Sequence, residues 1–451
     1  MKLKSVWVVM ASILAITSPA FSAGFAIIEQ SVSGLGNAFS GGAASAEDAT
    51  TVFFNPAGLT RLEGQQAIAG VNLIIPQAKF NNKGSTHVTG QPLTGDDGGD
   101  GGATRVVPNL YYAARLQNGI ALGLGINAPF GLATEYDDGW VGRYHALRSE
   151  VKTVNINPSI ACKVNDHLSL GAGVSAQYIQ AELSNAIDFG TVAFQSSGGL
   201  LGTPQGMDGK AELEADSWGY GFNLGALYEF NENSRVGFAY RSQVRQDLEG
   251  DADFKIPASV TSLPFGVGTG VAAAFADTDV SGDLVLPETV SVSAYHRFNP
   301  KWAVMADVTW TNWSRFDELR IEFDANKNGI TLADSVTTES WDDSWRYSLG
   351  ATYNPSESLA LRAGVAYDVE AIPDVEHRTP RIPGDDRTWV AVGAGYRLND
   401  RLTFDLAYAH LFVADPEINK NPVGEDALRG GLKGKYDAAV DIVSVQLAYN
   451  F

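Results

Sequence analysis

The chain has 451 residues, with 52 Asp and Glu against 32 Lys and Arg, a formal net charge of −20 and a single cysteine, Cys162. This acidic excess argues against nucleic acid as a partner, because nucleic acid is a polyanion and is repelled by a negatively charged protein. One cysteine excludes an internal disulfide and any metal site built from several cysteines.

The first 22 residues have the pattern of a secretory signal peptide. Two early lysines precede an apolar run from Val6 to Ile16, and Ala20 and Ser22 stand where a signal peptidase reads small residues. The run is too short for a membrane-spanning helix, which needs about 20 apolar residues. We therefore predict that residues 1–22 are a signal peptide, cleaved after Ser22.

Residues 23–64 are rich in Gly, Ala and Ser, with a few apolar anchors such as Phe25 and Phe53 and no long alternation. Asn55-Pro56-Ala57 marks a turn in this segment, because proline fixes φ. Everything after the segment has the pattern of strands and turns. We expect residues 23–64 to fold as a hatch inside a barrel that residues 65–451 form.

The strongest strand signal is an alternation with period two. From Trp218 to Phe230, aromatic and apolar side chains alternate with small or polar ones, and aromatics stand at both ends, as in strands that cross two lipid interfaces. A soluble β-sandwich would also alternate, but these runs exceed the usual strand length of about 5–6 residues. No later stretch is apolar enough for a membrane helix. A membrane protein without such helices must be a closed barrel, because lipid cannot satisfy the backbone groups of an open sheet edge.

The connections between the alternating runs predict the topology. Six short, turn-rich connections alternate with seven long ones, which indicates an all-β fold: a 14-stranded antiparallel transmembrane β-barrel with both termini on the short-turn, periplasmic side of a Gram-negative outer membrane. The predicted long connections are about 76–105, 129–149, 184–212, 250–281, 325–340, 370–386 and 413–435.

The last strand alternates up to the terminal Phe451, a pattern that bacterial barrel-assembly machinery recognises. The alternative is an ordinary edge strand, which would leave a long apolar edge unpaired. We expect a monomer whose acidic outer loops meet lipopolysaccharide through divalent cations.

Motifs for catalysis and for cofactors are missing from the sequence. The six histidines lack His-Glu-x-x-His spacing, and neither a Gly-x-Ser-x-Gly elbow nor a phosphate-binding loop is present. The acidic run from Asp96 to Gly102 offers carboxylates for calcium, but it lacks the spacing of a known loop, so a flexible acidic loop is the preferred interpretation. We expect no enzymatic activity, no metal and no cofactor.

Several motifs together resemble the long-chain fatty acid and hydrophobic-compound outer-membrane transporter family. They occur in the family's order: Ala23-Gly24-Phe25, Ser33-Gly34-Leu35-Gly36, Phe54-Asn55-Pro56-Ala57-Gly58-Leu59, Pro129-Phe130-Gly131-Leu132, Trp140-Val141-Gly142-Arg143-Tyr144, Asn157-Pro158-Ser159, Leu286-Pro287-Glu288, Trp310-Thr311-Asn312-Trp313-Ser314, Pro380-Arg381-Ile382-Pro383 and Asp386-Arg387-Thr388-Trp389.

The resemblance implies a 14-stranded barrel, a lumenal hatch, an apolar groove among the outer loops, a deeper pocket near the mature N-terminus, and a kinked early strand for sideways release. The candidate ligand-binding residues are Phe25, Phe130, Leu132, Trp140, Arg143 and Tyr144, and the candidate hatch or gating residues are Asn55, Pro56, Ala57 and Pro129. For Arg143 and Tyr144, a loop-packing role is the alternative.

One departure from the family's pattern concerns the ligand. Where the best-known fatty-acid transporter of the family has basic residues that meet the carboxylate, this sequence has Asn185 and, approximately, Thr337. Long-chain fatty acids remain the foremost cargo, with monoaromatic hydrocarbons or alkanes as the alternative. An open diffusion porin and a phage receptor or adhesin are rival functions. Lumen arginines at 235, 241, 346 and 362 are expected to pair with acids or hatch groups.

Overall fold

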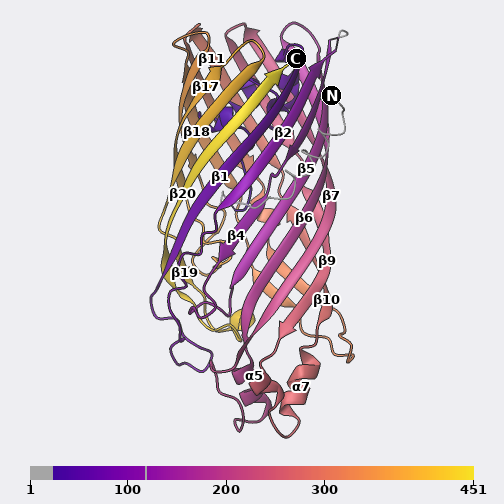
Figure 1. Cartoon of the computed structure of the whole chain (residues 1–451), viewed down its shortest axis with the longest axis vertical. Coiled ribbons are helices and arrows are strands. Elements are labelled where there is room, and N and C mark those ends of the chain that lie inside the picture. Colours follow the sequence, from indigo (N-terminus) through magenta and orange to yellow (C-terminus); the bar gives the residue numbers. More distant parts are fainter. Residues whose placement is uncertain (1–23, 117–118) are drawn as a thin grey trace.

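The computed structural model describes residues 24–116 and 119–451, so the predicted signal peptide lies outside the described residues. As predicted, the chain forms a closed barrel of 14 antiparallel strands (Figure 1). The last strand closes the barrel on the first, with register from Gln66 opposite Asn450 to Asn82 opposite Gly434. Closure gives the first and last strands a partner on both sides, because lipid cannot satisfy the backbone groups of an open sheet edge.

Most barrel strands are continuous, and the others consist of two segments in line. The continuous strands are β1 (Gln65–Asn82), β2 (Arg105–Arg115), β5 (Arg148–Lys163), β6 (Leu168–Asp188), β7 (Asp208–Asn231), β16 (Leu359–Asp368), β17 (Arg387–Arg397), β18 (Leu402–Val413) and β20 (Lys433–Asn450). The segmented strands are β3 (Ile120–Asn127) with β4 (Gly131–Glu135), β8 (Ser234–Arg241) with β9 (Val244–Lys255), β10 (Thr278–Leu286) with β11 (Thr289–Asn299), β12 (Trp302–Thr311) with β13 (Glu318–Phe323), and β14 (Ser335–Thr338) with β15 (Ser344–Tyr353).

Short turns and long loops lie at opposite ends of the barrel, as predicted. The C-terminus lies at the short-turn end, and the long loops at the other end carry helices α5 (Phe189–Ser196), α6 (Ala258–Thr261) and α7 (Val267–Ala274) (Figure 1). The same loops contain β19 (Glu417–Asn419) and the 3₁₀ turn η3 (Gly424–Asp426), whereas the 3₁₀ turn η2 (Trp313–Arg315) lies at the break between β12 and β13. No helix of the described chain is long and apolar enough to span a bilayer.

The strands extend farther outward than the sequence predicted, so several predicted loop boundaries are wrong. The predicted loop 184–212 begins inside β6 and ends inside β7, and the predicted loop 250–281 begins inside β9 and ends inside β10. The reason is an exchange of polarity between the two faces of each strand. The strand continues in the same phase, but its outward side chains become charged and its inward ones apolar.

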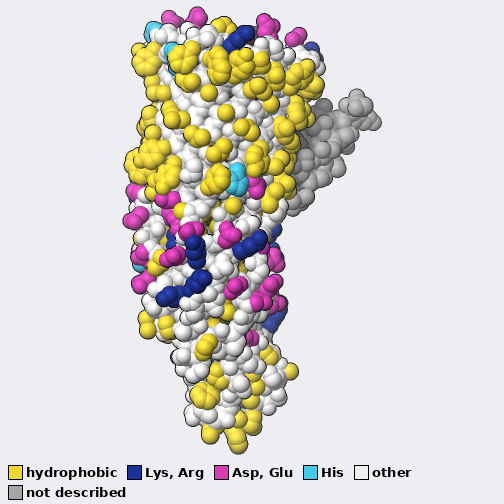
Figure 2. Space-filling model, turned by 90° about the vertical axis from the view of Figure 1, so that its left-hand side faces the viewer, with side chains coloured by type: hydrophobic (Ala, Val, Ile, Leu, Met, Phe, Trp, Pro, Cys, Tyr) yellow, Lys and Arg dark blue, Asp and Glu magenta, His cyan; other side chains and the backbone are white. Residues whose placement is uncertain are grey.

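Strand β7 shows this exchange most clearly. Its outward series passes from acidic to aromatic at Trp218, while its inward series passes from Leu213 and Ala215 to glycines and Asn223. Tyr220, within the aromatic part, is 73% exposed. Figure 2 shows the result on the surface, an apolar belt with a charged band beyond it. The belt is the height of barrel wall that lipid covers.

The hatch, Gly24–Leu62, lies inside the barrel and consists of four short helical turns. These are α2 (Val32–Leu35), α3 (Gly42–Ser45), α4 (Thr51–Phe54) and the 3₁₀ turn η1 (Pro56–Arg61). Inward glycines of the wall allow the hatch backbone to approach closely: a Cβ at Gly237 would lie 1.8 Å from the Ala43 carbonyl oxygen. The inward glycines of the alternating strands thus make room for the hatch.

Four lumen arginines hold the hatch to the wall, which confirms the prediction that they pair with acids or hatch groups. Arg235 donates to the carbonyl oxygens of Ala44 and Ser45 at 2.6 Å each, Arg241 to that of Phe53 at 2.9 Å, and Arg346 to that of Ala38 at 2.9 Å. Arg362 pairs with the hatch residue Glu47 and with Asp405 of β18. Charged donors of this kind form the stronger class of hydrogen bond.

Candidate functional site

The first described residues pair with the break between β3 and β4. The Ile27 amide donates to the Pro129 carbonyl oxygen at 2.8 Å, and the Gly131 amide donates to the Phe25 carbonyl oxygen at 2.8 Å. Proline cannot continue the ladder, so β3 ends at Asn127. The N-terminal segment therefore satisfies backbone groups that the broken strand exposes.

The break also removes a stretch of ladder from the barrel wall. β2 pairs with β3 only from Leu110 to Arg115, while β4 pairs with β5. Along Arg105–Asn109, β2 therefore has β1 as its only strand partner among the described residues. The interruption between Asn127 and Gly131 contains Pro129, one of the candidate gating residues.

Phe25 lies at the centre of an aromatic cluster. Its ring centroid is 4.9 Å from that of Trp313, 5.7 Å from Phe316, and 6.1 Å from both Phe130 and Trp341. Gly24 precedes it with φ of 64°, and a Cβ there would lie 2.5 Å from atoms of both tryptophans. The segment thus passes through the cluster where only glycine fits.

On the outer side of Phe25 lies a cavity that we call the outer cavity. The empty space between its lining atoms, including the part open to solvent, is about 840 Å³. Its lining comes mostly from the inward apolar side chains of the outer barrel, including Leu132, Leu213, Leu248 and Leu284. The polarity exchange along the strands therefore produces an apolar chamber in that part of the barrel where the outer surface is charged.

Four residues with ionisable side chains line the outer cavity among these apolar groups: Asp283, Arg320, Glu339 and Arg381. Burial raises the pKa of Glu339 to about 8, and the Trp341 indole donates to its carboxyl group at 3.0 Å. Burial lowers the pKa of Arg381 to about 10, so its guanidinium keeps its charge at neutral pH.

A second cavity, the inner cavity, lies between the hatch and strands β7, β8, β11, β12 and β15. The empty space between its lining atoms, including the part open to solvent, is about 1040 Å³. Ile27, Ile28 and Phe54 of the hatch give it an apolar side, and Pro129 and Phe130 reach it from the broken strand. Since Phe25 lines the outer cavity and Ala26 and Ile27 line the inner one, the N-terminal segment separates the two.

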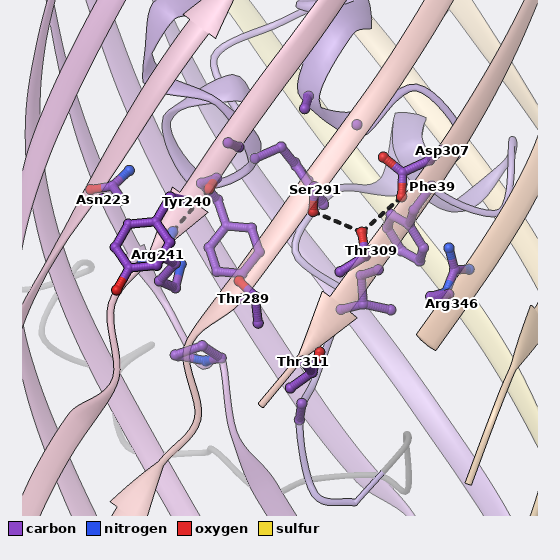
Figure 3. Close-up of a pocket in the computed structure, with 18 of the residues that line it drawn as sticks. Phe39, Asn223, Tyr240, Arg241, Thr289, Ser291, Asp307, Thr309, Thr311 and Arg346 are labelled. Carbon is purple, nitrogen blue, oxygen red and sulfur yellow. Dashed lines mark hydrogen bonds between the residues drawn. The ribbon is translucent and has the colours of Figure 1, made fainter. Parts of the chain in front are cut away.

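The barrel side of the inner cavity is polar (Figure 3). Thr309 donates to Asp307 at 2.8 Å and shares a hydrogen bond of 2.7 Å with Ser291, while Arg346 pairs with Asp368 at 2.9 Å. Arg241 and Arg346 lie on opposite sides of this row in the figure. The cavity thus offers one apolar and one polar wall, which suits an amphiphilic ligand better than a purely polar one.

The structure brings together only half of the predicted ligand-binding residues. Phe25, Phe130 and Leu132 belong to one buried cluster at the two cavities. Trp140 stacks on Tyr136 at 4.1 Å between ring centroids, in a separate cluster of loop residues.

Arg143 and Tyr144 belong to the same loop packing as Trp140. Arg143 pairs with Asp208 at 2.7 Å and donates to the Thr94 carbonyl oxygen at 2.5 Å, and the Tyr144 hydroxyl donates to Asp208 at 2.9 Å. This is the loop-packing alternative of the sequence interpretation.

The predicted hatch residues lie at the contact between hatch and wall. The Asn55 side chain accepts from the Ala57 amide at 3.0 Å and donates to the carbonyl oxygens of Ala43 at 2.6 Å and Ala226 at 3.0 Å. Pro56 opens the 3₁₀ turn η1 that follows Asn55. Asn55 therefore joins two parts of the hatch to strand β7.

Sequence reasoning missed Arg381, Glu339 and the leucines of the outer cavity. Asn185 and Thr337 are not among the residues that line this cavity; Asn185 donates to the Ala186 carbonyl oxygen, and Thr337 accepts from Arg429. The sequence did contain a signal for these residues, the charged outward side chains of β7. They stand in phase with the lipid-facing side chains of the same strand. Such a pattern indicates that the strand continues above the membrane and that its inward side chains there are apolar.

Comparisons with known proteins agree with this architecture. A model of the family described as "Outer membrane protein transport protein (OMPP1/FadL/TodX)" matches residues 13–451. The "Long-chain fatty acid transport protein" of Escherichia coli (strain K12) is 32% identical over 426 residues, covering 90% of this chain and 92% of that protein. A putative outer membrane protein of Neisseria meningitidis is 30% identical over 425 residues, covering 91% of each.

Among solved structures, a Pseudomonas aeruginosa FadL homologue matches with a TM-score of 0.85 at 27% identity, covering 95% of this chain and 100% of that chain. The Pseudomonas putida toluene transporter TodX matches with a TM-score of 0.61 at 18% identity, covering 90% of this chain and 94% of that chain, and so shares the fold.

Proposed function

Because the chain belongs to the OMPP1/FadL/TodX family of outer membrane transport proteins, we propose that it carries hydrophobic compounds passively into the cell, foremost long-chain fatty acids. The observation that supports this most is the apolar outer cavity, which ends against an N-terminal segment that closes the lumen. We propose transport with no enzymatic step and no cofactor.

Capture needs no energy source. Each methylene group that leaves water for an apolar cavity contributes about 0.8 kcal/mol. A long acyl chain therefore loads the outer cavity spontaneously, with Phe25 and Leu132 among its contacts. We place Trp140, Arg143 and Tyr144 in the capture step as well, as the packing that shapes the outer loops.

Release depends on the hatch. The ligand passes Phe25 to the inner cavity when the N-terminal segment moves, and that motion breaks the backbone bonds between Phe25–Ile27 and Pro129–Gly131. Because β2 and β4 share no ladder beside Pro129, the ligand leaves sideways there into the membrane. Asn55, Pro56 and Ala57 keep the remainder of the hatch seated.

Monoaromatic hydrocarbons and alkanes are the alternative cargo, by the same route. The relative named for long-chain fatty acids is 32% identical, whereas the toluene transporter at 18% identity supports only the fold. A diffusion porin is disfavoured because the hatch occupies the lumen, and an adhesin or phage receptor does not need two internal cavities.

We also propose two partners at the surface, lipopolysaccharide and the barrel-assembly machinery. The charged band beyond the apolar belt lies at the height of lipopolysaccharide head groups (Figure 2). In the unfolded chain, the assembly machinery would recognise Phe451. In the folded barrel, the Phe451 amide donates to the Gln65 carbonyl oxygen, where the last strand meets the first. The closed barrel works as a monomer with periplasmic termini.

The test uses a Gram-negative strain that lacks its own long-chain fatty acid transport protein. Expression of this chain should restore uptake of labelled oleate at low concentration, and uptake of labelled toluene shows whether aromatics share the route. Uptake equal with and without the protein would reject the proposal. In planar bilayers, the purified protein should show no steady conductance, whereas a porin would conduct.

A further inference from the structure

Four lysines gather where β1 meets β20, just beyond the apolar belt, and we call them the seam lysines. Lys79 lies in β1 and Lys83 directly after it, while Lys433 and Lys435 begin β20. The Lys83 amide donates to the Lys433 carbonyl oxygen at 2.8 Å, and Asn81 stands opposite Lys435 in the ladder. Figure 2 views the side of the barrel on which β18 and β20 lie and shows basic side chains directly beyond the belt. A chain with a formal net charge of −20 thus carries a concentrated positive patch at this seam.

Most of this positive charge has no acidic partner. In the part of the chain that the structure describes, Lys435 pairs with Asp415 at 2.5 Å, whereas the other three seam lysines are exposed and form no ion pair. Asp437 stands opposite Lys79 in the ladder but forms no ion pair with it. Cations held at neighbouring positions repel one another, and an anion from outside the chain relieves that repulsion.

The opposite sign prevails in the outer charged band on β9 and β10. The exposed acids there are Asp247, Glu249, Asp251, Asp253, Asp279 and Asp283. The arginine among them, Arg245, is already paired with Asp247 at 2.9 Å and with Asp283 at 2.6 Å. A phosphate group is repelled from this sector unless a divalent cation bridges it, whereas the seam lysines attract it directly.

The seam lysines begin at the height of lipid phosphates. Ala67 of β1 stands opposite Tyr449, near the short-turn end of the barrel. Lys79 lies twelve residues farther along β1, which at about 3.4 Å per residue and a tilt of about 40° is about 31 Å along the membrane normal. The lipid-covered band of such barrels is about 25 Å tall. Lys79 therefore lies just outside the hydrocarbon, where the outer leaflet presents the phosphates of lipid A.

A polar cluster lies inside the belt, directly below the seam lysines. His410 of β18 stands opposite Asp441 of β20, with 2.8 Å between its Nδ1 and the carboxylate, and the Tyr408 hydroxyl donates to the same carboxylate oxygen at 2.7 Å. Exposed apolar side chains such as Val390 and Val443 surround it. Ionisable groups on the lipid face of a barrel are destabilising. A plain hydrocarbon chain cannot bond to them, whereas the acyl chains of lipid A carry hydroxyl, ester and amide groups next to the sugar.

We propose that the outer part of the seam between β1 and β20 binds the lipid A portion of lipopolysaccharide. Lys79, Lys83 and Lys433 bind its phosphate groups, and the cluster of His410 and Asp441 bonds to the polar groups of its acyl chains. The inference rests on the proposed function, in which lipopolysaccharide is a partner, and it names the place and the chemistry of that contact. Because both strands supply lysines, the site is complete only in the closed barrel.

Three paired lysines of the outer charged band provide a matched control. Lys152 of β5 pairs with Glu182 at 3.4 Å, Lys210 of β7 pairs with Glu212 at 2.9 Å, and Lys255 of β9 pairs with the same Glu212. Replacing these three by Gln changes the net charge as much as replacing Lys79, Lys83 and Lys433. Their charge is already offset by acids, so they should contribute little to the binding of an anion.

The experiment uses the full-length protein purified in detergent, with a chelator present so that no divalent cation can bridge. Native mass spectrometry measures the binding of bisphosphorylated lipid A, of dephosphorylated lipid A and of phosphatidylglycerol. Wild-type protein should prefer bisphosphorylated lipid A to both other lipids by about tenfold or more, as expected for charge-assisted contacts.

The variants separate the seam lysines from net charge. Lys79→Gln with Lys83→Gln and Lys433→Gln should weaken binding of bisphosphorylated lipid A about tenfold or more, because the phosphate contacts are lost. Lys152→Gln with Lys210→Gln and Lys255→Gln should stay within about twofold of wild type. His410→Leu with Asp441→Leu should weaken lipid A binding several-fold and leave phosphatidylglycerol unchanged.

Contrary outcomes are equally specific. Equal losses in the two lysine variants would mean that net charge alone matters and would overturn the site. Unchanged lipid A binding after His410→Leu with Asp441→Leu would remove the polar cluster from it. One measurement needs no variant: wild-type protein that binds dephosphorylated lipid A or phosphatidylglycerol as tightly as bisphosphorylated lipid A overturns the proposal even if a variant does not fold.

A cargo measurement keeps this inference separate from the transport function. The fatty acid 9,10-dibromostearate quenches tryptophan fluorescence, and Trp313 and Trp341 beside Phe25 serve as reporters. All variants should bind it as wild type does, because none of the substitutions lies at the two cavities. Wild-type protein that fails to bind dibromostearate but prefers bisphosphorylated lipid A would reject the transport proposal and support the lipid A site.

Discussion

At neutral pH the carboxyl group of Glu339 holds its proton because the outer cavity disfavours its charged form. Its pKa of about 8 is set first by burial, opposed by Lys420, Trp341 and Arg381 and reinforced by Glu425. As pH rises through 8, Glu339 ionises and offsets the charge of Arg381. The folded protein also loses stability over the range from the ordinary glutamate pKa up to 8, because only its folded state keeps the proton.

A pH series tests this assignment. A monocarboxylic acid in water stays ionised from pH 7 to pH 9 because its ordinary pKa is about 4. We expect the affinity of wild-type protein for dibromostearate to fall several-fold between pH 7 and pH 9, since Glu339 becomes an anion beside the ligand. Glu339→Gln, which cannot ionise, should show a flat profile over the same range. An equal decline of affinity in both proteins would show that ionisation of Glu339 does not affect ligand binding.

At the scale of single elements, the hatch is held by contacts that tolerate little displacement. The Asn55 side chain donates to the Ala226 carbonyl oxygen of β7. It can come this close to the strand because the neighbouring residue, Gly225, has no side chain. A Cβ at Gly225 would lie 1.9 Å from the Asn55 side-chain oxygen and 3.0 Å from the Pro56 ring. Because both atoms belong to a buried turn, neither can move away freely.

Gly225→Ala should therefore unseat this part of the hatch. Overpacking of this kind typically costs about 1–3 kcal/mol, so we expect a lower thermal transition of the folded barrel and a new ion conductance in planar bilayers. Gly270→Ala is the control, because a Cβ at Gly270 of α7 meets nothing within 4 Å. A variant as stable and as closed as wild type would show that the hatch does not depend on this contact.

The element pattern accounts for what the sequence predicted and for what it missed. The alternation of short and long connections predicted the number of strands, because it follows from local turn chemistry, whereas the kinked early strand was implied by the resemblance to the transporter family. The loop boundaries failed where β7 changes the polarity of its outer face before Trp218. The position of Arg381 at the outer cavity could not be predicted, because its contacts involve loop residues more than two hundred positions away in the sequence, such as Ser149.

At the scale of the whole molecule, the barrel combines two tubes with opposite polarity. Within the membrane, the outer face of the barrel is apolar and its lumen contains the hatch. Beyond the membrane, the outer face is charged (Figure 2) and the lumen is lined by apolar side chains. In the proposed transport route, a hydrophobic compound therefore leaves water above the lipid surface, inside the protein.

Neighbouring positions on β7 test this two-tube arrangement. Leu213 lines the outer cavity, whereas Glu214 faces outward and accepts from Gln180 at 2.6 Å. Leu213→Gln should lower fatty acid affinity about tenfold or more, because it places an unpaired amide among apolar groups. Glu214→Gln should leave affinity unchanged. Similar effects from the two substitutions would mean that the ligand does not enter this part of the lumen.

The lumen arginines and Gln446, whose side chain accepts from the Val32 amide at 3.2 Å, come from strands β8 to β20, in the second half of the chain. The hatch can reach its final bonds only after β20 has been made and joined to β1. We therefore expect that the hatch, Gly24–Leu62, becomes fully seated only when the barrel closes, because its contact through Gln446 requires the last strand.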